Sequence, residues 1–350
     1  MSFDVCGLDG GEVCLDLTFP SATLRAAAAR LADVLVREGP FELVLGPAGY
    51  GLPLMRAEDV GARERSLMLL LREDEKRAEV GIEGMGAVIR ALLRAGLPLV
   101  FGPGVVHLPT VPAYRKWNRI DMGTADKVAS AALCIVDQAR RLDVSYAESS
   151  FVMLELGGAF TAALAVDRGR IVDGLGGSSG PMGAQASGAL DGEVAYLLGE
   201  HLSKATLFGG GPLSAHPGVD LSAAAALPAL RRDPRLRDGW LAIEESAAKA
   251  VLALTAVVRR PREVLVSGRL VHAPGLLEAL AERLAHVAPV RRVAGLGARA
   301  STAAQGAALL ADGLAGGAFA PLAAQMRIRD ARGSALDYLR LPGAEHIRLA

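Results

Sequence analysis

A carboxylate and a pair of glycines interrupt an apolar stretch near the middle of this sequence. The run "FVMLELGGAFTAALAV" carries Glu155, Gly157, Gly158 and Thr161 between residues that otherwise read as two core strands. Glycines between antiparallel strands let the backbone approach a ligand, with amide groups pointing outward as an anion nest. A carboxylate in an apolar strand needs a polar partner or a raised pKa. We therefore favour a catalytic role for Glu155 over a structural one.

A similar turn lies near the start of the chain, where Asp9 is followed by Gly10 and Gly11. Asp9 is a candidate to hold Mg²⁺ or to position an acceptor; the alternative is a turn aspartate that caps its own backbone. Its place at the end of an apolar strand favours the functional reading. Two such turns would grip a polyphosphate from two sides if the halves of the chain face each other.

Two glycine-rich loops are further candidates for contact with a nucleotide. Gly176, Gly177 and Ser178 belong to a glycine and serine loop that either wraps phosphates, acts as a lid or merely connects two elements. A second set, Ser267-Gly268-Arg269, follows a strand, and nucleotide bases commonly dock at strand ends in α/β folds. A plain strand-to-helix turn is the alternative there.

A polar loop between residues 106 and 123 precedes a long helix that begins at Thr124 or Asp126. Asp126 would act as a base toward a substrate hydroxyl, or it is simply a first-turn carboxylate that the helix dipole stabilises. The loop and the start of the helix supply the candidates for binding an anionic substrate, which are Arg115, Lys116, Asn118 and Lys127. An ordinary solvated loop is the alternative reading.

The composition excludes several classes of protein. The chain has 350 residues, 51% of them apolar and 22% charged, with a formal net charge of zero. A large core is easily filled, two domains are expected, and neither a nucleic-acid surface nor an anionic-membrane surface is indicated. No apolar stretch reaches the ~20 residues that span a bilayer. Three cysteines without metal-like spacing suit a reducing cytosol, so we expect a cytoplasmic protein.

Apolar periodicity predicts an α/β chain with a mixed sheet in each half. We expect Ser21 to cap the first helix, and we lean to a strand for "ERSLMLLLRED" at 64–74, although its pattern also fits a helix. The expected helices cover 22–37, 84–96, 124–141, 191–200, 238–258, 274–287 and 301–317. The other expected strands cover 3–18 with a central glycine turn, 42–48, 98–104, 152–156, 159–166, 170–172, 263–270 and 290–296.

Four stretches, taken in their order and spacing, resemble the sugar kinase, heat-shock chaperone and actin superfamily, and within it the acetate and butyrate kinases. "ELGGAFTAALAVDRGRIVDG" is similar to the second phosphate hairpin of butyrate kinases, and "VLVSGRL" (264–270) to their adenosine-binding strand and loop. "GLGGSSGPMGAQASGALD" (174–191) matches their glycine loop, and "AAQGAALLADGLAGG" (303–317) their closing helix. "HLPTVPAYRKWNRIDMGTADK" (107–127) resembles a butyrate-kinase-like family of archaeal type without an assigned activity.

The resemblance implies a two-lobed, ribonuclease-H-like (actin-like ATPase) duplicated fold with an interdomain cleft. It implies lobes at 1–121 and 122–302, with 303–350 returning to the first lobe. It further implies an ATP-dependent phosphotransferase that uses Mg²⁺ and acts on a small carboxylate or hydroxyl acceptor. By resemblance, the glycines and hydroxyls of the turns bind the nucleotide, Asp9 holds the metal, and Asp9, Asp126 and Glu155 are the catalytic residues.

Two departures from the family pattern leave alternatives open. The first turn reads Asp-Gly-Gly-Glu, so the usual hydroxyls are missing and Glu12 adds negative charge beside a polyphosphate. Glu155 stands where the acyl kinases have a histidine. The alternatives are a kinase-fold pseudoenzyme and a nucleotide-binding or ATPase partner protein with a degenerate first phosphate loop. Alanine-rich helices at 22–37 and 241–258 leave a homodimer open.

Overall fold

The computed structural model describes residues 2–20, 24–73, 82–214, 216, 219 and 224–350. The chain divides into two compact units. Unit 1 contains residues 1–120, 124–142 and 294–350, and unit 2 contains residues 121–123 and 143–293. The long helix at 125–142 and residues 294–302 thus group with unit 1, whereas the boundaries predicted from the sequence assign them to the second lobe.

A mixed five-stranded sheet forms the centre of unit 2, with strand order β10-β9-β6-β7-β8. Strands β10, β9 and β6 run parallel, and β6, β7 and β8 form an antiparallel meander. The strand bounds are β6 Phe151–Leu156, β7 Thr161–Asp167, β8 Arg170–Leu175, β9 Glu263–Ser267 and β10 Val290–Arg292.

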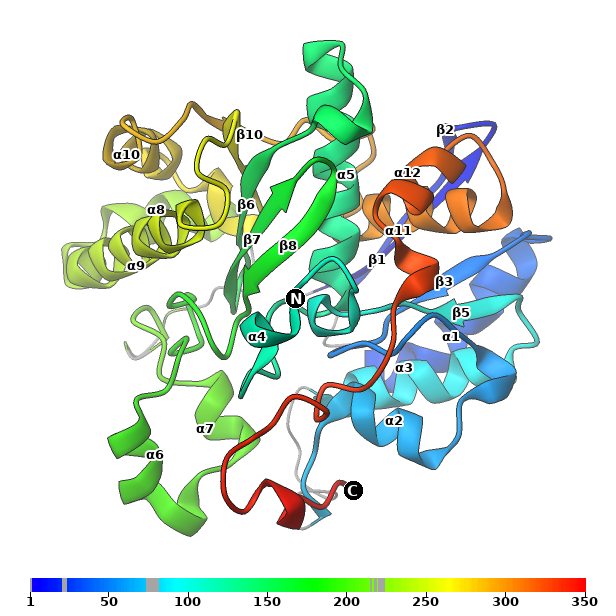
Figure 1. Cartoon of the computed structure of the whole chain (residues 1–350), viewed down its shortest axis with the longest axis horizontal. Helices are drawn as coiled ribbons and strands as arrows, with labels where there is room; N and C mark the ends of the chain where they lie inside the picture. The colour runs from blue at the N-terminus through cyan, green and yellow to red at the C-terminus, as the bar shows by residue number, and fades with distance from the viewer. Residues whose placement is uncertain (1, 21–23, 74–81, 215, 217–218, 220–223) are drawn as a thin grey trace. The chain divides into compact units, whose positions relative to one another are not determined.

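The central strands are apolar on both faces because both faces are covered. All six residues of β6 and all five of β9 are buried. Val152, Leu154 and Leu156 lie on the face that packs on the long helix α9 (Arg237–Thr255), with Trp240 and Ile243 in the same core cluster. Side chains alternate along a strand, so Glu155 lies on the opposite face. Figure 1 shows α9 beside this sheet.

The remaining helices of unit 2 are short. They are α6 Gly192–Leu198, α7 Lys204–Phe208, α8 Leu227–Arg232 and α10 Leu276–Arg283. Asp191 caps α6 by accepting hydrogen bonds from the N–H groups of Glu193 and Val194, and Ser203 caps α7.

Unit 1 contains a hairpin and a small sheet. Strands β1 (Ser2–Asp9) and β2 (Glu12–Pro20) pair antiparallel, and β3 (Val44–Gly46), β5 (Leu99–Phe101) and β4 (Met55–Arg56) form a second sheet in that order. The helices of this unit include α1 Leu24–Glu38, α2 Ala62–Leu69, α3 Ile82–Arg94, α4 Ala113–Lys116, α5 Ala125–Leu142, α11 Thr302–Ala315 and α12 Ala320–Gln325.

The predicted helices and strands are confirmed in most places, with bounds that differ by up to a few residues in either direction. Both glycine-turn hairpins, the helix after Thr124 and the closing helix form as expected. Ser21, the predicted cap, lies outside the described residues. No helix among the described residues is long and apolar enough to cross a membrane.

The strand predicted over 64–74 is wrong, because residues 62–69 form the helix α2. The Glu64 carboxylate accepts a hydrogen bond from the Gly61 N–H, which starts the helix, and Leu70 ends it in a left-handed conformation. Only Leu67 and Met68 of the helix are buried. The short apolar run fits either structure, and the end caps decide between them.

The close packing of α11 on α5 depends on Gly306. A Cβ atom at this position would overlap the backbone carbonyl of Ala129 on α5, which cannot move aside without shifting its helix. Gly84 on α3 has no neighbour within 4 Å of the same added atom, so the two glycines form a matched pair.

We expect Gly306→Ala to lower the free energy of unfolding by about 2 kcal/mol or more, the usual scale of overpacking. Gly84→Ala should raise it by about 0.5–1 kcal/mol through helix propensity. Urea denaturation followed by circular dichroism measures both. Equal effects for the two variants would contradict the packing argument.

Candidate functional site

The turn between β6 and β7 forms a tight hairpin with two amides that donate no hydrogen bond to the described residues. The Gly157 N–H donates to the carbonyl of Phe160 at 2.9 Å, which leaves Gly158 and Ala159 at the tip. Within the described residues, the N–H groups of Gly158 and Ala159 donate no hydrogen bond. Backbone donors without a protein partner at a glycine turn are suited to bind an anion.

Two buried hydroxyls near this hairpin have no hydrogen-bond partner among the described residues, namely Thr161 Oγ1 and Ser267 Oγ. Thr161 pairs with Leu156 at the start of β7, and Ser267 pairs with Glu155 at the end of β9. Buried polar atoms are nearly always satisfied, so an orphan is a candidate ligand contact. The two hydroxyls lie on opposite faces of the sheet, beside the same hairpin.

The loop after β9 is fixed against the hairpin by glycine. Gly268 has φ +94°, and a Cβ there would overlap the backbone of Leu156. This close approach lays Arg269 on the hairpin, with its Cδ 3.5 Å from the position of a Cβ on Gly158. The predicted nucleotide residues Gly157, Gly158, Thr161, Ser267, Gly268 and Arg269 thus come together at one edge of the unit 2 sheet.

Asp121 organises the glycine and serine loop after β8. Its carboxylate accepts hydrogen bonds from the N–H and the hydroxyl of Ser178, both at 2.9 Å, and from the Gly123 N–H at 3.1 Å. The Asp121 carbonyl accepts from the Gly176 N–H at 3.1 Å. Asp121 is 7% exposed. Sequence reasoning did not assign it this role, because its partners lie far along the chain.

The loop also approaches the hairpin tip. A Cβ on Gly177 would overlap the ring of Phe160, and one on Gly183 would overlap the backbone of Ala159. The amides of Gln185 and Ala186 both donate to the Ala159 carbonyl at 3.1 Å. Gly176, Gly177 and Ser178 are therefore held in place against 121–123 and 157–160.

The first glycine turn, in unit 1, presents two carboxylates. Asp9 pairs with Glu12 across the turn, both are exposed, and Gly10 and Gly11 between them have φ +55° and +89°. Two central residues with positive φ match the hairpin turn that glycine favours. The usual hydroxyls of this turn are absent here, as the sequence indicated.

Asp126 and Lys127 bind each other at the start of α5. The Lys127 ammonium lies 2.6 Å from the Asp126 carboxylate, which also accepts a hydrogen bond from the Thr124 hydroxyl. The structure therefore gives Asp126 local partners of the kind a first-turn acid has. Neither role predicted for it is tested by these contacts.

No group of three or more histidine, cysteine or acidic side chains among the described residues is arranged to hold a metal ion. A magnesium ion, which is typically held by one or two carboxylates together with substrate phosphates, does not need such a group.

A family model described as "Protein of unknown function (DUF1464)" matches residues 1–341. The chain belongs to this family. No curated protein sequence matches it. The solved structures similar to this member of the family include acyl kinases, at identities that establish the fold alone.

A propionate kinase from Francisella tularensis matches with a TM-score of 0.56 at 14% identity, covering 81% of this chain and 83% of that one. An acetate kinase from Entamoeba histolytica matches with a TM-score of 0.52 at 11% sequence identity, covering 79% of this chain and 75% of that one. An acetate kinase from Porphyromonas gingivalis matches with a TM-score of 0.50 at 13% sequence identity, covering 86% of this chain and 87% of that one. The DUF1464 chain therefore has the kinase-like, two-lobed actin-like ATPase fold.

The polar loop at 105–119 of the DUF1464 chain packs against the C-terminal segment of the same unit. The Lys116 ammonium donates to the Leu108 carbonyl at 2.8 Å and lies 4.8 Å from the centre of the Tyr338 ring. Burial lowers the pKa of Lys116 to about 8. Asn118 accepts a hydrogen bond from the Arg340 N–H at 2.7 Å.

These contacts give two of the predicted substrate-binding residues a structural partner. Lys116 is only 3% exposed. Arg115 lies over the ring of Tyr114, with 5.5 Å from the guanidinium carbon to the ring centre. Substrate binding by this loop stays a prediction, and its best-placed cation is Arg115 rather than the buried lysine.

His107 in the same loop links stability to pH. Burial is the main cause that lowers its pKa to about 4, and the nearby Lys116 lowers it further. The folded state keeps the imidazole neutral while the unfolded state takes up a proton below about pH 6.5. Its stability contribution is complete above pH 6.5 and is lost as the pH falls toward 4.

We expect unfolding to cost about 3 kcal/mol less at pH 4 than at pH 7 on account of His107. The variant His107→Asn should flatten this dependence, whereas His286→Asn, at an exposed position, should leave it unchanged. Denaturant titrations at several pH values measure the slope. An unaltered slope in His107→Asn would assign the acid sensitivity to other groups.

Proposed function

We propose that this protein is an ATP-dependent phosphotransferase of the butyrate-kinase-like type, acting on a small carboxylate or hydroxyl acceptor. The observation that carries the proposal is a set of polar groups at the β6–β7 turn that have no hydrogen-bond partner among the described residues: the amides of Gly158 and Ala159 and the buried hydroxyls of Thr161 and Ser267. The kinase-like fold supports the same reading.

The residues of the hairpin fit a nucleotide polyphosphate. In this proposal the amides of Gly158 and Ala159 donate to phosphate oxygens, and Thr161 supplies a hydroxyl at the base of the same turn. Donors fixed by the fold stabilise developing charge without reorganising during the reaction. The glycines keep side chains away from the backbone, so a phosphate can approach the amides.

The loops around the hairpin supply the remaining nucleotide contacts in this proposal. Ser267, Gly268 and Arg269 follow β9, where a nucleoside docks in α/β folds. Gly176, Gly177 and Ser178 line the other side, and Asp121 acts as a positioning residue because it holds Ser178. The bound nucleotide supplies the phosphoryl group that is transferred.

Glu155 orients the acceptor in this proposal. It is 9% exposed and is the second-to-last residue of β6, which ends at Leu156 just before the turn. An ionised carboxylate accepts hydrogen bonds but donates none, so it suits a role toward an acceptor hydroxyl or water rather than toward the phosphoryl oxygens. Asp9, exposed at its own turn, is the candidate contact for a Mg²⁺ ion that accompanies the nucleotide.

We expect calorimetric titration to show micromolar binding of ATP with Mg²⁺. Ser267→Ala and Thr161→Val should each weaken it about tenfold or more, since a hydrogen bond to a charged group contributes about 1.5–3 kcal/mol. Ser149→Ala is the matched control, because Ser149 Oγ is another buried, unpartnered hydroxyl and lies before the opposite end of β6. No binding at millimolar nucleotide, or equal losses in all three variants, would overturn the proposal.

A second function is favoured by the two carboxylates of the first turn. Exposed Glu12 opposite Asp9 repels a polyphosphate, which fits a nucleotide-binding or ATPase partner protein that transfers phosphate to no small acceptor. Phosphate release from ATP in the absence of any acceptor, with Glu155 orienting water, would distinguish this function.

We expect Glu12→Thr to tighten ATP binding by about tenfold, because it removes one negative charge near the phosphates. Glu42→Thr, at an exposed position in the same unit, should have no effect. The same calorimetric titration measures both variants. Unchanged affinity in Glu12→Thr would contradict this expectation and show that the first turn does not meet phosphate.

A further inference from the structure

The helix α6 in unit 2 carries large apolar side chains and buries none of them. Tyr196 is 80% exposed, Leu197 79% and Val194 44%. No residue of α6, or of the single turn 199–201 that follows, is buried. Scattered apolar residues on a surface are ordinary, but two adjacent residues at this level of exposure form a patch.

A helix of this length does not persist in water on its own propensity. Isolated helices shorter than about 12–15 residues are marginal, and helices in proteins are stabilised mainly by packing an apolar face. α6 spans Gly192–Leu198, and its Asp191 cap contributes only about 1 kcal/mol. Its apolar side chains therefore need a surface to pack on.

The charge around α6 restricts what that surface is. Residues 189–203 contain Asp191, Glu193 and Glu200 and no lysine or arginine, a formal charge of −3. Glu193 and Glu200 are exposed. A complementary surface combines an apolar hollow with unpaired positive charge.

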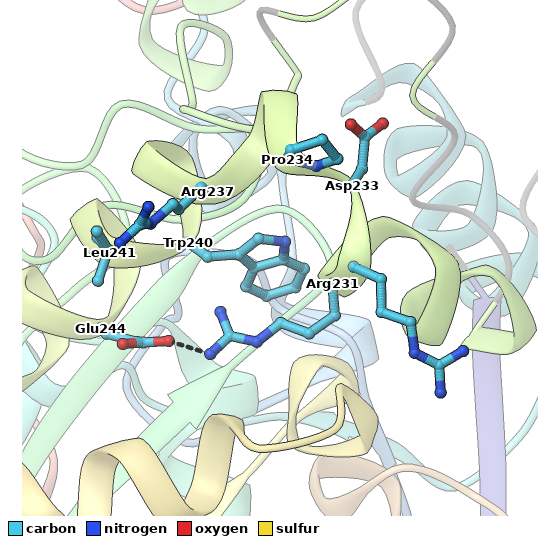
Figure 2. Close-up of a pocket in the computed structure, with 8 residues that line it drawn as sticks. Arg231, Asp233, Pro234, Arg237, Trp240, Leu241 and Glu244 are labelled. Atoms are coloured by element: carbon cyan, nitrogen blue, oxygen red, sulfur yellow. Dashed lines mark hydrogen bonds and ion pairs between the residues drawn. The ribbon is translucent and has the colours of Figure 1, made fainter.

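The same unit contains such a surface at the start of α9. Residues 231–237 hold four arginines and one aspartate, a formal charge of +3. They border a hollow of about 390 Å³ whose apolar lining consists of Pro234, the buried Trp240, which is 1% exposed, and Leu241, which is 42% exposed. Figure 2 shows Arg231 lying along Trp240 and reaching Glu244, at 2.5 Å.

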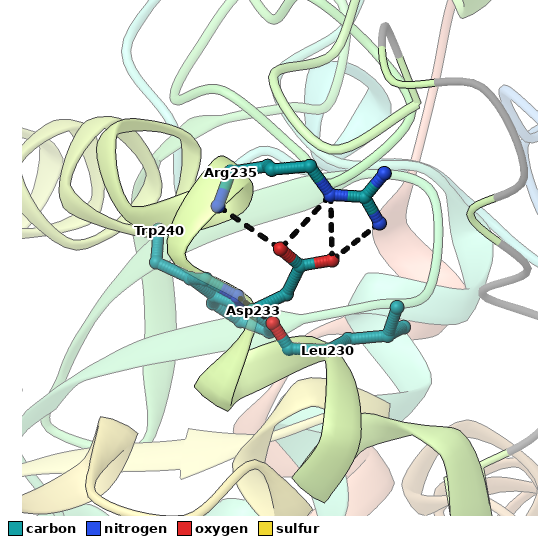
Figure 3. A network of polar contacts seen from close by, with 4 residues as sticks. All are labelled: Leu230, Asp233, Arg235 and Trp240. Atoms are coloured by element: carbon teal, nitrogen blue, oxygen red, sulfur yellow. Dashed lines mark hydrogen bonds and ion pairs between the residues drawn. The ribbon is translucent and has the colours of Figure 1, made fainter.

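Two of the four arginines at 231–237 form ion pairs. Arg231 pairs with Glu244, and Arg235 holds Asp233 through its guanidinium and its backbone N–H, as Figure 3 shows. Arg232 and Arg237 are exposed and have no ion-pair partner among the described residues. The hollow thus presents the exposed side chain of Leu241 beside two arginines that form no ion pair with the described residues.

We propose that a second copy of this chain covers α6: the helix of one copy docks in the arginine-bordered hollow of the other. Tyr196 and Leu197 pack against Leu241 and the side chain of Arg231 that covers Trp240, and Glu193 and Glu200 face Arg232 and Arg237. Tyrosine, tryptophan and arginine are the residues that most often anchor interfaces. In a two-fold pair each copy gives its helix and receives its partner's, so the contact forms twice.

Sedimentation velocity of the full chain tests the interface directly. The wild type sediments as a dimer at micromolar concentration, and Leu197→Asp shifts it to the monomer. Leu341→Asp is the matched control, since Leu341 is 59% exposed and lies in unit 1, and it stays dimeric. A monomeric wild type, or a dimer that Leu197→Asp leaves intact, overturns the proposal.

Charge reversal identifies the two surfaces. One variant carries Glu193→Arg with Glu200→Arg, and the other carries Arg232→Glu with Arg237→Glu. When either variant is alone, a dimer would bring like charges together in both of its contacts. Each variant alone therefore sediments as a monomer. Mixed in equal amounts, they restore opposite charges in both contacts and form a heterodimer. Two monomers that stay apart when mixed overturn the pairing. Nucleotide binding is not involved, so the outcome is independent of the proposed function.

Discussion

The candidate site depends on how closely the backbone packs around the turn between β6 and β7. Side chains at 177, 183 and 268 would overlap the ring of Phe160, the backbone of Ala159 and the backbone of Leu156. Two separate loops, one after β8 and one after β9, therefore lie against one hairpin at three glycines without side chains between them. A hairpin of this length would be marginal alone; the surrounding loops fix it, so the amides at its tip are held in one geometry.

This packing also explains why hydroxyls and a carboxylate are buried at the end of apolar strands. Thr161, Ser267 and Glu155 belong to β7, β9 and β6, so the register of the sheet sets their relative positions. Groups on paired strands are held more precisely than groups on a loop. Asp121 fixes the glycine and serine loop in a similar way, because its carboxylate accepts two hydrogen bonds from Ser178. That loop has no regular secondary structure of its own.

Local signals predicted both hairpins and most helices, because a glycine turn between alternating strands and a capped amphipathic run are read from neighbouring residues. The error at 64–74 arose where the apolar run is short and the deciding contacts are the caps at Gly61 and Leu70. The role of Asp121 was not predictable, since its partner Ser178 is 57 residues away. Lys116 looked like a substrate ligand, but it meets Tyr338 across 222 residues. A sequence pattern identifies a positively charged residue, but it does not show in which direction the side chain points.

The two units differ in how their chain is laid out. Apart from residues 121–123, unit 2 is one continuous segment, 143–293, while unit 1 joins residues 1–142 to residues 294–350. In unit 1, α5 packs on α11, and the backbone amides at 299–301 bind Asp16 and Asp4 of the first hairpin. A growing chain can complete the contacts of unit 2 as soon as that segment has emerged. Unit 1 cannot complete its contacts until residues 294–350 have been synthesised. Until then the inner faces of its hairpin and of α5 stay exposed. The order of synthesis thus makes the earlier part of the chain the later one to fold, and the half that most needs protection from aggregation.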